Sequence, residues 1–184
     1  MTLGERIKQK IRKKNVIFSL IGIFLAMALI SFTVGKDLLS GKEPSLISFA
    51  IINFAGYLFF LLLPLETLIP YYIAYGYNGV TLIIIVMAVA MVAQVINFAV
   101  GYLMSGEIIH DLVGKTKFEK LHRYIEKYGA WAIFLFNLFP LASSVLSLVA
   151  GMARYSLKKL LFYSFLGLLI KYILLVYFSD KIFF

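Results

Sequence analysis

Long apolar runs with few polar positions dominate this chain and predict its main elements. Residues 16–34, 79–103 and 157–178 each approach the length that a helix needs to cross a bilayer, which is roughly 20 residues. Two other apolar runs, residues 47–77 and 130–153, are interrupted by prolines and polar side chains. Hydrophobic residues make up 62% of the sequence and charged residues only 15%, too little charge for the surface of a soluble domain. We therefore expect an all-α integral membrane protein.

The two interrupted runs predict re-entrant helical hairpins. Within residues 130–151, Asn137 interrupts the apolar sequence, a proline and three serines follow, and an Ala-Gly pair closes the run. Polar groups at membrane depth are tolerated only where they are buried in protein or face a water-filled cavity. We therefore expect each run to fold as two half-helices that line a site within the bilayer. The residues predicted to break the hairpins are Pro64, Pro70, Pro140 and Gly151.

Clusters of basic residues predict the orientation of the chain. Six of the 18 lysines and arginines lie within residues 1–15, next to the first spanning run, and predict a basic interfacial segment that binds anionic headgroups. The positive-inside rule then places the N-terminus in the cytoplasm and residues 35–47 outside. Residues 16–184 are expected to form one multi-pass domain in the plasma membrane.

The segment 104–129 is expected to be cytoplasmic and amphipathic. It carries further lysines and arginines, Thr116 and Glu119 form a capping box, and Gly129 is a suitable helix stop. A basic patch also follows the second interrupted run. The second hairpin is therefore expected to enter and leave the membrane on the cytoplasmic side, and the first hairpin is expected to enter and leave it on the outer side. Two opposed hairpins, each followed by a spanning helix, form the layout of inverted repeats in transporters.

A weak internal repeat at an offset of 76 residues agrees with this layout. Its clearest element is the proline in each hairpin, and we interpret it as the duplication of one hairpin-and-helix unit. The matching residues are Phe60, Leu62, Pro64, Leu65 and Ala74 in the first copy and Phe136, Leu138, Pro140, Leu141 and Ala150 in the second.

Glu66 and Lys171 are the charges embedded most clearly in apolar sequence. A charged side chain at the centre of a membrane helix costs roughly 2.5–3.5 kcal/mol on insertion scales, so a charge that is kept there is a functional candidate. Glu66 could bind a headgroup amine or carry a proton, and Lys171 could bind a lipid phosphate or pair with Glu66. The alternatives are that Lys171 snorkels to the outer interface and that Glu66 caps a hairpin tip near the surface.

Neutral polar residues within the apolar runs are the remaining candidates for a transport path. Serines in a broken helix also bond back to their own backbone, and Gln94 and Asn97 could join helices instead of contacting a substrate. Arg154, which follows the second hairpin, is expected to anchor a headgroup. The candidate path residues are Glu66, Lys171, Asn137, Ser143, Ser144, Ser147, Gln94 and Asn97.

The order of short motifs resembles the DedA family, also called the SNARE-associated Golgi or VTT-domain superfamily. Residues 126–134 read EKYGAWAIF, and Pro140 stands ten residues before an Ala-Gly pair, as in that family. The tripeptide that ends in Glu66 is similar to the family's Pro-Gly/Ser-Glu element, and the likeness covers residues 55–178. Members of the superfamily are implicated in moving lipids, including phospholipids and polyprenyl phosphates, across or between leaflets.

Departures from the family pattern change what the resemblance implies. The bacterial pattern often has arginines three residues before and three after the hairpin proline, where this chain has Asn137 and Ser143. Its Asp and Arg in the preceding helix are Gln94 and Tyr102 here. Proton coupling is proposed for some members, and the missing charges argue against it in this chain. They also argue against tight binding of a multiply charged phosphate.

The resemblance thus implies lipid translocation or scrambling through a polar groove between the hairpins, with membrane lipids as partners. Two alternatives stay open: a proton- or cation-coupled small-solute transporter that uses Glu66, and a non-transporting membrane adaptor. The sequence has no cysteine, phosphate-binding glycine loop or nucleophile–base pair, so we expect neither an enzyme nor a cofactor. His110 and His122 lack a carboxylate cluster at ligand spacing, so no metal site is expected. Nucleic-acid binding is disfavoured because the basic cluster adjoins an apolar run, and assembly with further copies of the chain is left open.

Overall fold

The computed structural model describes residues 43–59, 65–103, 115–139 and 143–183. No strand occurs among these residues, so the described fold is all-α. The predicted interfacial segment 1–15, the predicted spanning run 16–34 and the prolines Pro64 and Pro140 lie outside the described residues. The elements are α2 (Leu46–Phe59), the 3₁₀ helix η1 (Leu65–Thr67), α3 (Leu68–Ala74), α4 (Gly79–Leu103), α6 (Lys115–Leu138), α7 (Ser143–Met152) and α8 (Leu157–Phe183).

The helices α4 and α8 are long and apolar enough to cross a membrane. They coincide with two of the predicted spanning runs, and α8 continues past the expected end at residue 178 to Phe183. Only 33% of the most apolar stretch of each helix is buried within the described structure. Large apolar side chains are therefore exposed along both helices, as at Ile84 on α4 and Ile173 on α8. Exposed apolar faces on helices of this length are surfaces that membrane lipids cover.

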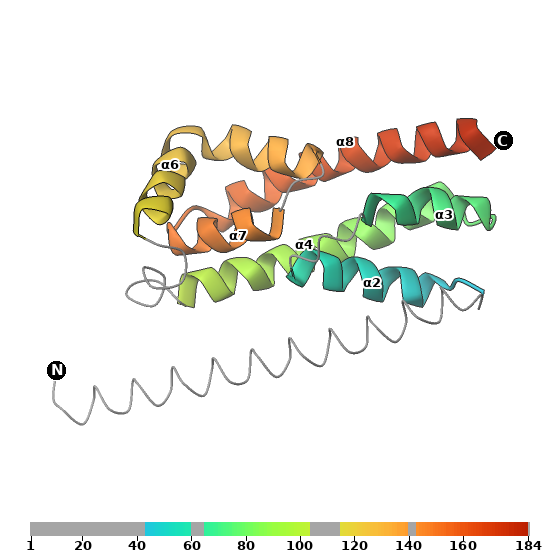
Figure 1. Cartoon of the computed structure of the whole chain (residues 1–184), viewed down its shortest axis with the longest axis horizontal. Helices are drawn as coiled ribbons and strands as arrows, with labels where there is room; N and C mark the ends of the chain where they lie inside the picture. Colours follow the sequence, from blue (N-terminus) through green and yellow to red (C-terminus); the bar gives the residue numbers. More distant parts are fainter. Residues whose placement is uncertain (1–42, 60–64, 104–114, 140–142, 184) are drawn as a thin grey trace, which may run out of the picture. The chain divides into compact units, whose positions relative to one another are not determined.

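Both interrupted runs contain a longer helix followed by a shorter one. The second run is not one continuous helix, because α6 ends at Leu138 and α7 begins at Ser143. In the first run the chain folds back, since the hydroxyls of Ser48 and Tyr72 are 2.7 Å apart and join the start of α2 to α3. The helix α2 lies along α4 and α6 lies along α8, whereas α3 packs on α8 and α7 packs on α4 (Figure 1). Each short helix thus packs on the long helix that follows the other interrupted run.

The connections from α3 to α4 and from α7 to α8 have the same hydrogen-bond pattern. Each short helix ends in a Schellman motif, closed by the backbone N–H of Tyr77 at 3.2 Å in one case and of Tyr155 at 2.9 Å in the other. The turn residues Gly76 and Arg154 both have a positive φ, 84° and 56°. These turns and the starts of α4 and α8 recur at an offset of 78 residues, whereas the residue matches have an offset of 76. The hydrogen-bonded helix ends therefore define a local repeat, and its offset is two residues longer than the offset of the residue matches.

Two residues, Pro70 and Gly129, do not end or break helices as the sequence predicts. Pro70 lies in the first turn of α3, where its missing N–H has no helical acceptor to lose. The helix α6 continues through Gly129, which instead lies against the ring of Tyr155. Gly151 lies within α7 and faces the backbone of α4. At both glycines the missing side chain serves close packing.

Four helices meet in one apolar cluster. This cluster combines side chains of α7 with single contributions from α4, α6 and α8, and it fixes α7 against the other three helices. Phe98 and Ile133 each lie five residues before the last residue of their helix, so the cluster forms near the C-terminal ends of α4 and α6. The buried members are Phe98, Ile133, Leu146, Val149, Ala150, Met152 and Leu160.

Candidate functional site

Lys171 and Glu66 form an ion pair between α8 and η1. Lys171 Nζ lies 3.2 Å from Glu66 Oε1, and the two side chains are 9% and 25% exposed. Lys171 lies near the middle of α8, where an unpaired lysine would be costly in a membrane. Its ammonium is paired with Glu66, and Lys171 is buried. The structure thus places the two embedded charges together, and the geometry favours pairing over snorkelling.

Two buried tyrosines complete this group. The Lys171 ammonium donates to the Tyr57 hydroxyl at 3.3 Å, and the hydroxyls of Tyr57 and Tyr172 are 2.6 Å apart. Lys171 Nζ also lies 5.7 Å from the centroid of the Tyr57 ring and 5.1 Å from that of Tyr172, within the range of cation–π attraction. We call Glu66, Lys171, Tyr57 and Tyr172 the ionic cluster. It offers a cation, an anion and two hydroxyls between apolar helices.

A second polar cluster joins α4, α6 and α8 without any charge. Gln94 Nε2 donates to Asn137 Oδ1 at 2.7 Å, and Asn137 Nδ2 donates to Ser164 Oγ at 3.1 Å. The three side chains are at most 1% exposed, and we call them the amide cluster. Gln94 Oε1 has no hydrogen-bond partner among the residues that the structure describes. The amide cluster therefore keeps one buried acceptor that could receive a further hydrogen bond.

Asn97 connects the two clusters along α4. Its Nδ2 donates to the backbone oxygen of Tyr57 at 3.0 Å, while the hydroxyl of Tyr57 belongs to the ionic cluster. Asn97 follows Gln94 by one helical turn, so both amides lie on the same side of α4. Asn97 thus lies beside both clusters: it is bonded to Tyr57 of the ionic cluster and lies one turn from Gln94 of the amide cluster.

The predicted serines Ser143, Ser144 and Ser147 lie in α7 and are at most 6% exposed. Ser147 Oγ donates to the backbone oxygen of Ser143 at 3.0 Å. This bond satisfies the hydroxyl of Ser147 within its own helix, as serines in helices often do. None of the three serines belongs to the ionic or the amide cluster, because those clusters draw their side chains from α2, η1, α4, α6 and α8.

Arg154 lies at the turn after α7 and stacks on Tyr102 near the end of α4. The distance from its guanidinium carbon to the ring centroid is 3.8 Å, which is close enough for cation–π attraction. Its φ of 56° is a left-handed conformation that is uncommon for residues other than glycine. Burial raises the pKa of the adjacent Tyr155 hydroxyl, which therefore stays neutral near pH 7. Arg154 is an exposed residue in the turn that precedes α8.

The sequence-based list of candidates omits three residues of these clusters: Tyr57, Tyr172 and Ser164. Ser164 carried a usable signal, because it lies seven residues before Lys171 and therefore on the same face of α8. Tyr57 carried no such signal, since its role depends on contact with Lys171, 114 residues away in the chain.

Comparison with known proteins places the chain in a family. The sequence pattern described as the VTT domain matches residues 54–181. The chain belongs to the VTT-domain family. Two curated relatives of this VTT-domain protein, both named Protein DedA, come from Escherichia coli strain K12 and Escherichia coli O157:H7 and are 23% identical over 100 residues. The match covers 52% of this chain and 46% of each relative, so it spans about half the length of the curated proteins. No solved structure matches the chain.

The described structure of this VTT-domain protein brings two departures from the DedA pattern into contact. Gln94 stands where the resemblance implies an aspartate, and Asn137 stands where it implies an arginine. In the amide cluster these two side chains are hydrogen-bonded to each other. A neutral pair therefore occupies the positions at which the resemblance implies opposite charges.

Proposed function

We propose that this membrane protein of the DedA/VTT family moves phospholipids between leaflets. The observation that carries the proposal is the ion pair of Lys171 with Glu66, which lies among apolar helices and is extended by the Tyr57 and Tyr172 hydroxyls. Ionisable groups within membrane segments are costly and mark substrate or ion pathways. The ionic cluster is accordingly the proposed binding point for a lipid headgroup.

Two re-entrant hairpins would bring the clusters to membrane depth. The second helices of the interrupted runs, α3 with 7 residues and α7 with 10, are well below the roughly 20 residues that a spanning helix needs. Each is followed by a long apolar helix, and the turns between them recur at an offset of 78 residues. These features support an inverted repeat in which one hairpin enters the membrane from each side.

In the proposed mechanism, the ionic cluster exchanges its internal pair for a headgroup. A zwitterionic headgroup carries a phosphate and an amine, so its phosphate would pair with Lys171 while its amine pairs with Glu66. The tyrosine hydroxyls and the amide cluster would then take the place of water around the headgroup, and the lipid tails would stay in the bilayer. An unsatisfied polar group in hydrocarbon costs several kcal/mol, so these substitute contacts lower the barrier to crossing.

Reconstitution in liposomes tests this function. The vesicles contain a trace of phosphatidylethanolamine with a fluorescent acyl chain, and chemical reduction of the outer-leaflet label reports leaflet exchange. We expect the wild-type protein to accelerate exchange, and Glu66→Gln and Lys171→Met each to slow it about tenfold, which corresponds to roughly 1.4 kcal/mol of barrier. Lys181→Met, a change of an exposed lysine in the last turn of the same helix, is the matched control and should keep the wild-type rate. Failure to accelerate exchange of any lipid tested would contradict the proposal.

A second candidate function is proton- or cation-coupled transport of a small solute. It is favoured by one observation, the 25% exposure of the Glu66 side chain, which leaves its carboxylate open to ion or proton exchange. Under this alternative, Glu66→Gln abolishes pH-dependent solute flux into the same vesicles and leaves lipid exchange unchanged. A non-transporting adaptor would show neither effect.

A further inference from the structure

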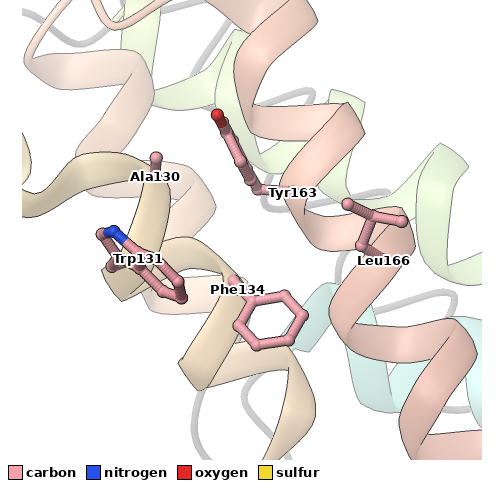
Figure 2. A pocket seen from close by; sticks show the side chains of 5 residues that line it. All are labelled: Ala130, Trp131, Phe134, Tyr163 and Leu166. Atoms are coloured by element: carbon pink, nitrogen blue, oxygen red, sulfur yellow. The ribbon is translucent and has the colours of Figure 1, made fainter.

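A cleft lies between α6 and α8, and none of its lining residues belongs to either polar cluster. Figure 2 shows its lining: Ala130, Trp131 and Phe134 come from α6, and Tyr163 and Leu166 come from α8. The cleft has a volume of about 320 Å³. Trp131 is 70% exposed, so the cleft opens to the outside of the helix bundle. One wall of the cleft is α8, which is long and apolar enough to cross a membrane, and lipid covers the outer faces of such helices.

The two ends of this cleft differ in chemistry. The hydroxyl of Tyr163 points toward the end marked by Ala130, whereas Phe134 and Leu166 line the opposite end with hydrocarbon (Figure 2). Lys159 lies one helical turn before Tyr163 and on the same face of α8, and it is exposed. Lys159 does not line the cleft, but its position on α8 places a lysine beyond the end at which the Tyr163 hydroxyl lies.

We propose that this cleft binds one anionic glycerophospholipid from the leaflet at which α8 begins. The lipid phosphate would lie at Lys159 and the Tyr163 hydroxyl, and one acyl chain would lie along Trp131 toward Leu166. The charge of Lys159 complements an anionic headgroup, and tryptophan and tyrosine favour the level of the headgroups, where one edge is polar and the other apolar. The apolar end of the cleft offers no hydrogen-bonding group, so it suits a hydrocarbon chain. This inference concerns a stably bound lipid and does not depend on the proposed transport.

The single tryptophan of the chain gives a direct readout of occupancy. The full-length protein is reconstituted in phosphatidylcholine vesicles that contain a small fraction of lipid with brominated acyl chains, which quench tryptophan on contact. The quenching of Trp131 is compared for brominated phosphatidylglycerol and for brominated phosphatidylcholine. We expect phosphatidylglycerol to quench about fivefold more effectively per mole, the equivalent of the roughly 1 kcal/mol that one lysine contributes near anionic lipid.

Two neighbouring lysines provide a matched pair of variants. Lys159→Ala is expected to remove the preference for phosphatidylglycerol. Lys158→Ala removes an equal charge from the same turn but about 100° around the helix, and it should keep the preference. Ala130→Leu fills the cleft and should lower quenching by both brominated lipids, with an unchanged elution volume as the check that the protein is folded.

Equal quenching of wild-type Trp131 by the two brominated lipids would overturn the proposal, since it would indicate ordinary boundary lipid. Equal effects of Lys158→Ala and Lys159→Ala would do the same, because they would reduce the preference to general surface charge. If Lys159→Ala does not yield folded protein, the Ala130→Leu variant decides the question on its own: unchanged phosphatidylglycerol quenching would place that lipid outside the cleft.

Discussion

Gly101 of α4 and Gly151 of α7 each lie against the backbone of the other's helix. A Cβ atom on Gly101 would come within 2.0 Å of the Leu148 carbonyl oxygen, and one on Gly151 within 2.1 Å of the Phe98 carbonyl oxygen. Backbone atoms cannot rotate aside as the end of a flexible side chain can. The close crossing of α4 and α7 therefore depends on two residues without side chains, as in other tight helix pairs of membrane proteins.

Replacing either glycine by alanine should separate these helices. We expect Gly101→Ala and Gly151→Ala each to reduce the free energy of unfolding by about 1–3 kcal/mol, the usual cost of overpacking a core. Thermal unfolding of the detergent-solubilised protein measures the effect. Gly56→Ala is the control, because the three atoms nearest to an added Cβ there belong to the side chain of Leu65 and not to a backbone. A Gly101→Ala protein that melts with the wild type would show that the crossing is looser than described.

The ion pair between Glu66 and Lys171 predicts that the two side chains stabilise each other in the folded protein. Lys171→Met leaves the Glu66 carboxylate without its partner and should destabilise the protein by about 1.5–3 kcal/mol, the range for hydrogen bonds to charged groups. The double variant Glu66→Gln with Lys171→Met should be less destabilised than the sum of the single variants. Chemical denaturation of all four proteins completes the double-mutant cycle. Strict additivity would mean that the two charges do not stabilise each other.

The two tyrosines of the ionic cluster should have unequal effects. The Tyr57 hydroxyl contacts both Lys171 and Tyr172, whereas the Tyr172 hydroxyl contacts Tyr57. Tyr57→Phe should therefore destabilise the protein more than Tyr172→Phe, by about 1 kcal/mol, the net value of one further hydrogen bond. The pair of variants is matched because each loses one buried hydroxyl, and their melting temperatures give the comparison. The reverse order would place the lysine ammonium nearer to Tyr172.

The amide cluster predicts the outcome of restoring charge. Asn137→Arg would bury an unpaired charge beside Gln94 and Ser164 and should cost about 3–5 kcal/mol, as broken buried ion pairs do. Adding Gln94→Asp supplies an opposite charge at the contacting position, so the double variant should recover at least half of that loss. Folded yield and thermal stability in detergent report both effects. Equal loss in the single and double variants would indicate that the two positions do not contact each other.

The local features of this protein were accessible from its sequence. Uninterrupted apolar runs indicated α4 and α8, because hydrophobicity over the length of a bilayer is encoded residue by residue. The polar residues that interrupt apolar sequence indicated Glu66, Lys171, Gln94 and Asn137 as the positions with a special role, because an embedded polar group is costly wherever it lies. The family assignment followed in the same way from the order of short motifs and is confirmed by the match over residues 54–181.

The partners of these residues were decided only by the tertiary structure. Lys171 pairs with a carboxylate 105 residues away, and Gln94 meets Asn137 across 43 residues, separations at which no helical periodicity applies. The same holds for Gly129, which the sequence suggests as a helix end and which instead makes room for Tyr155. The sequence shows locally where a buried polar side chain or a glycine occurs. Which residue bonds to that side chain or packs against that glycine depends on how distant helices pack.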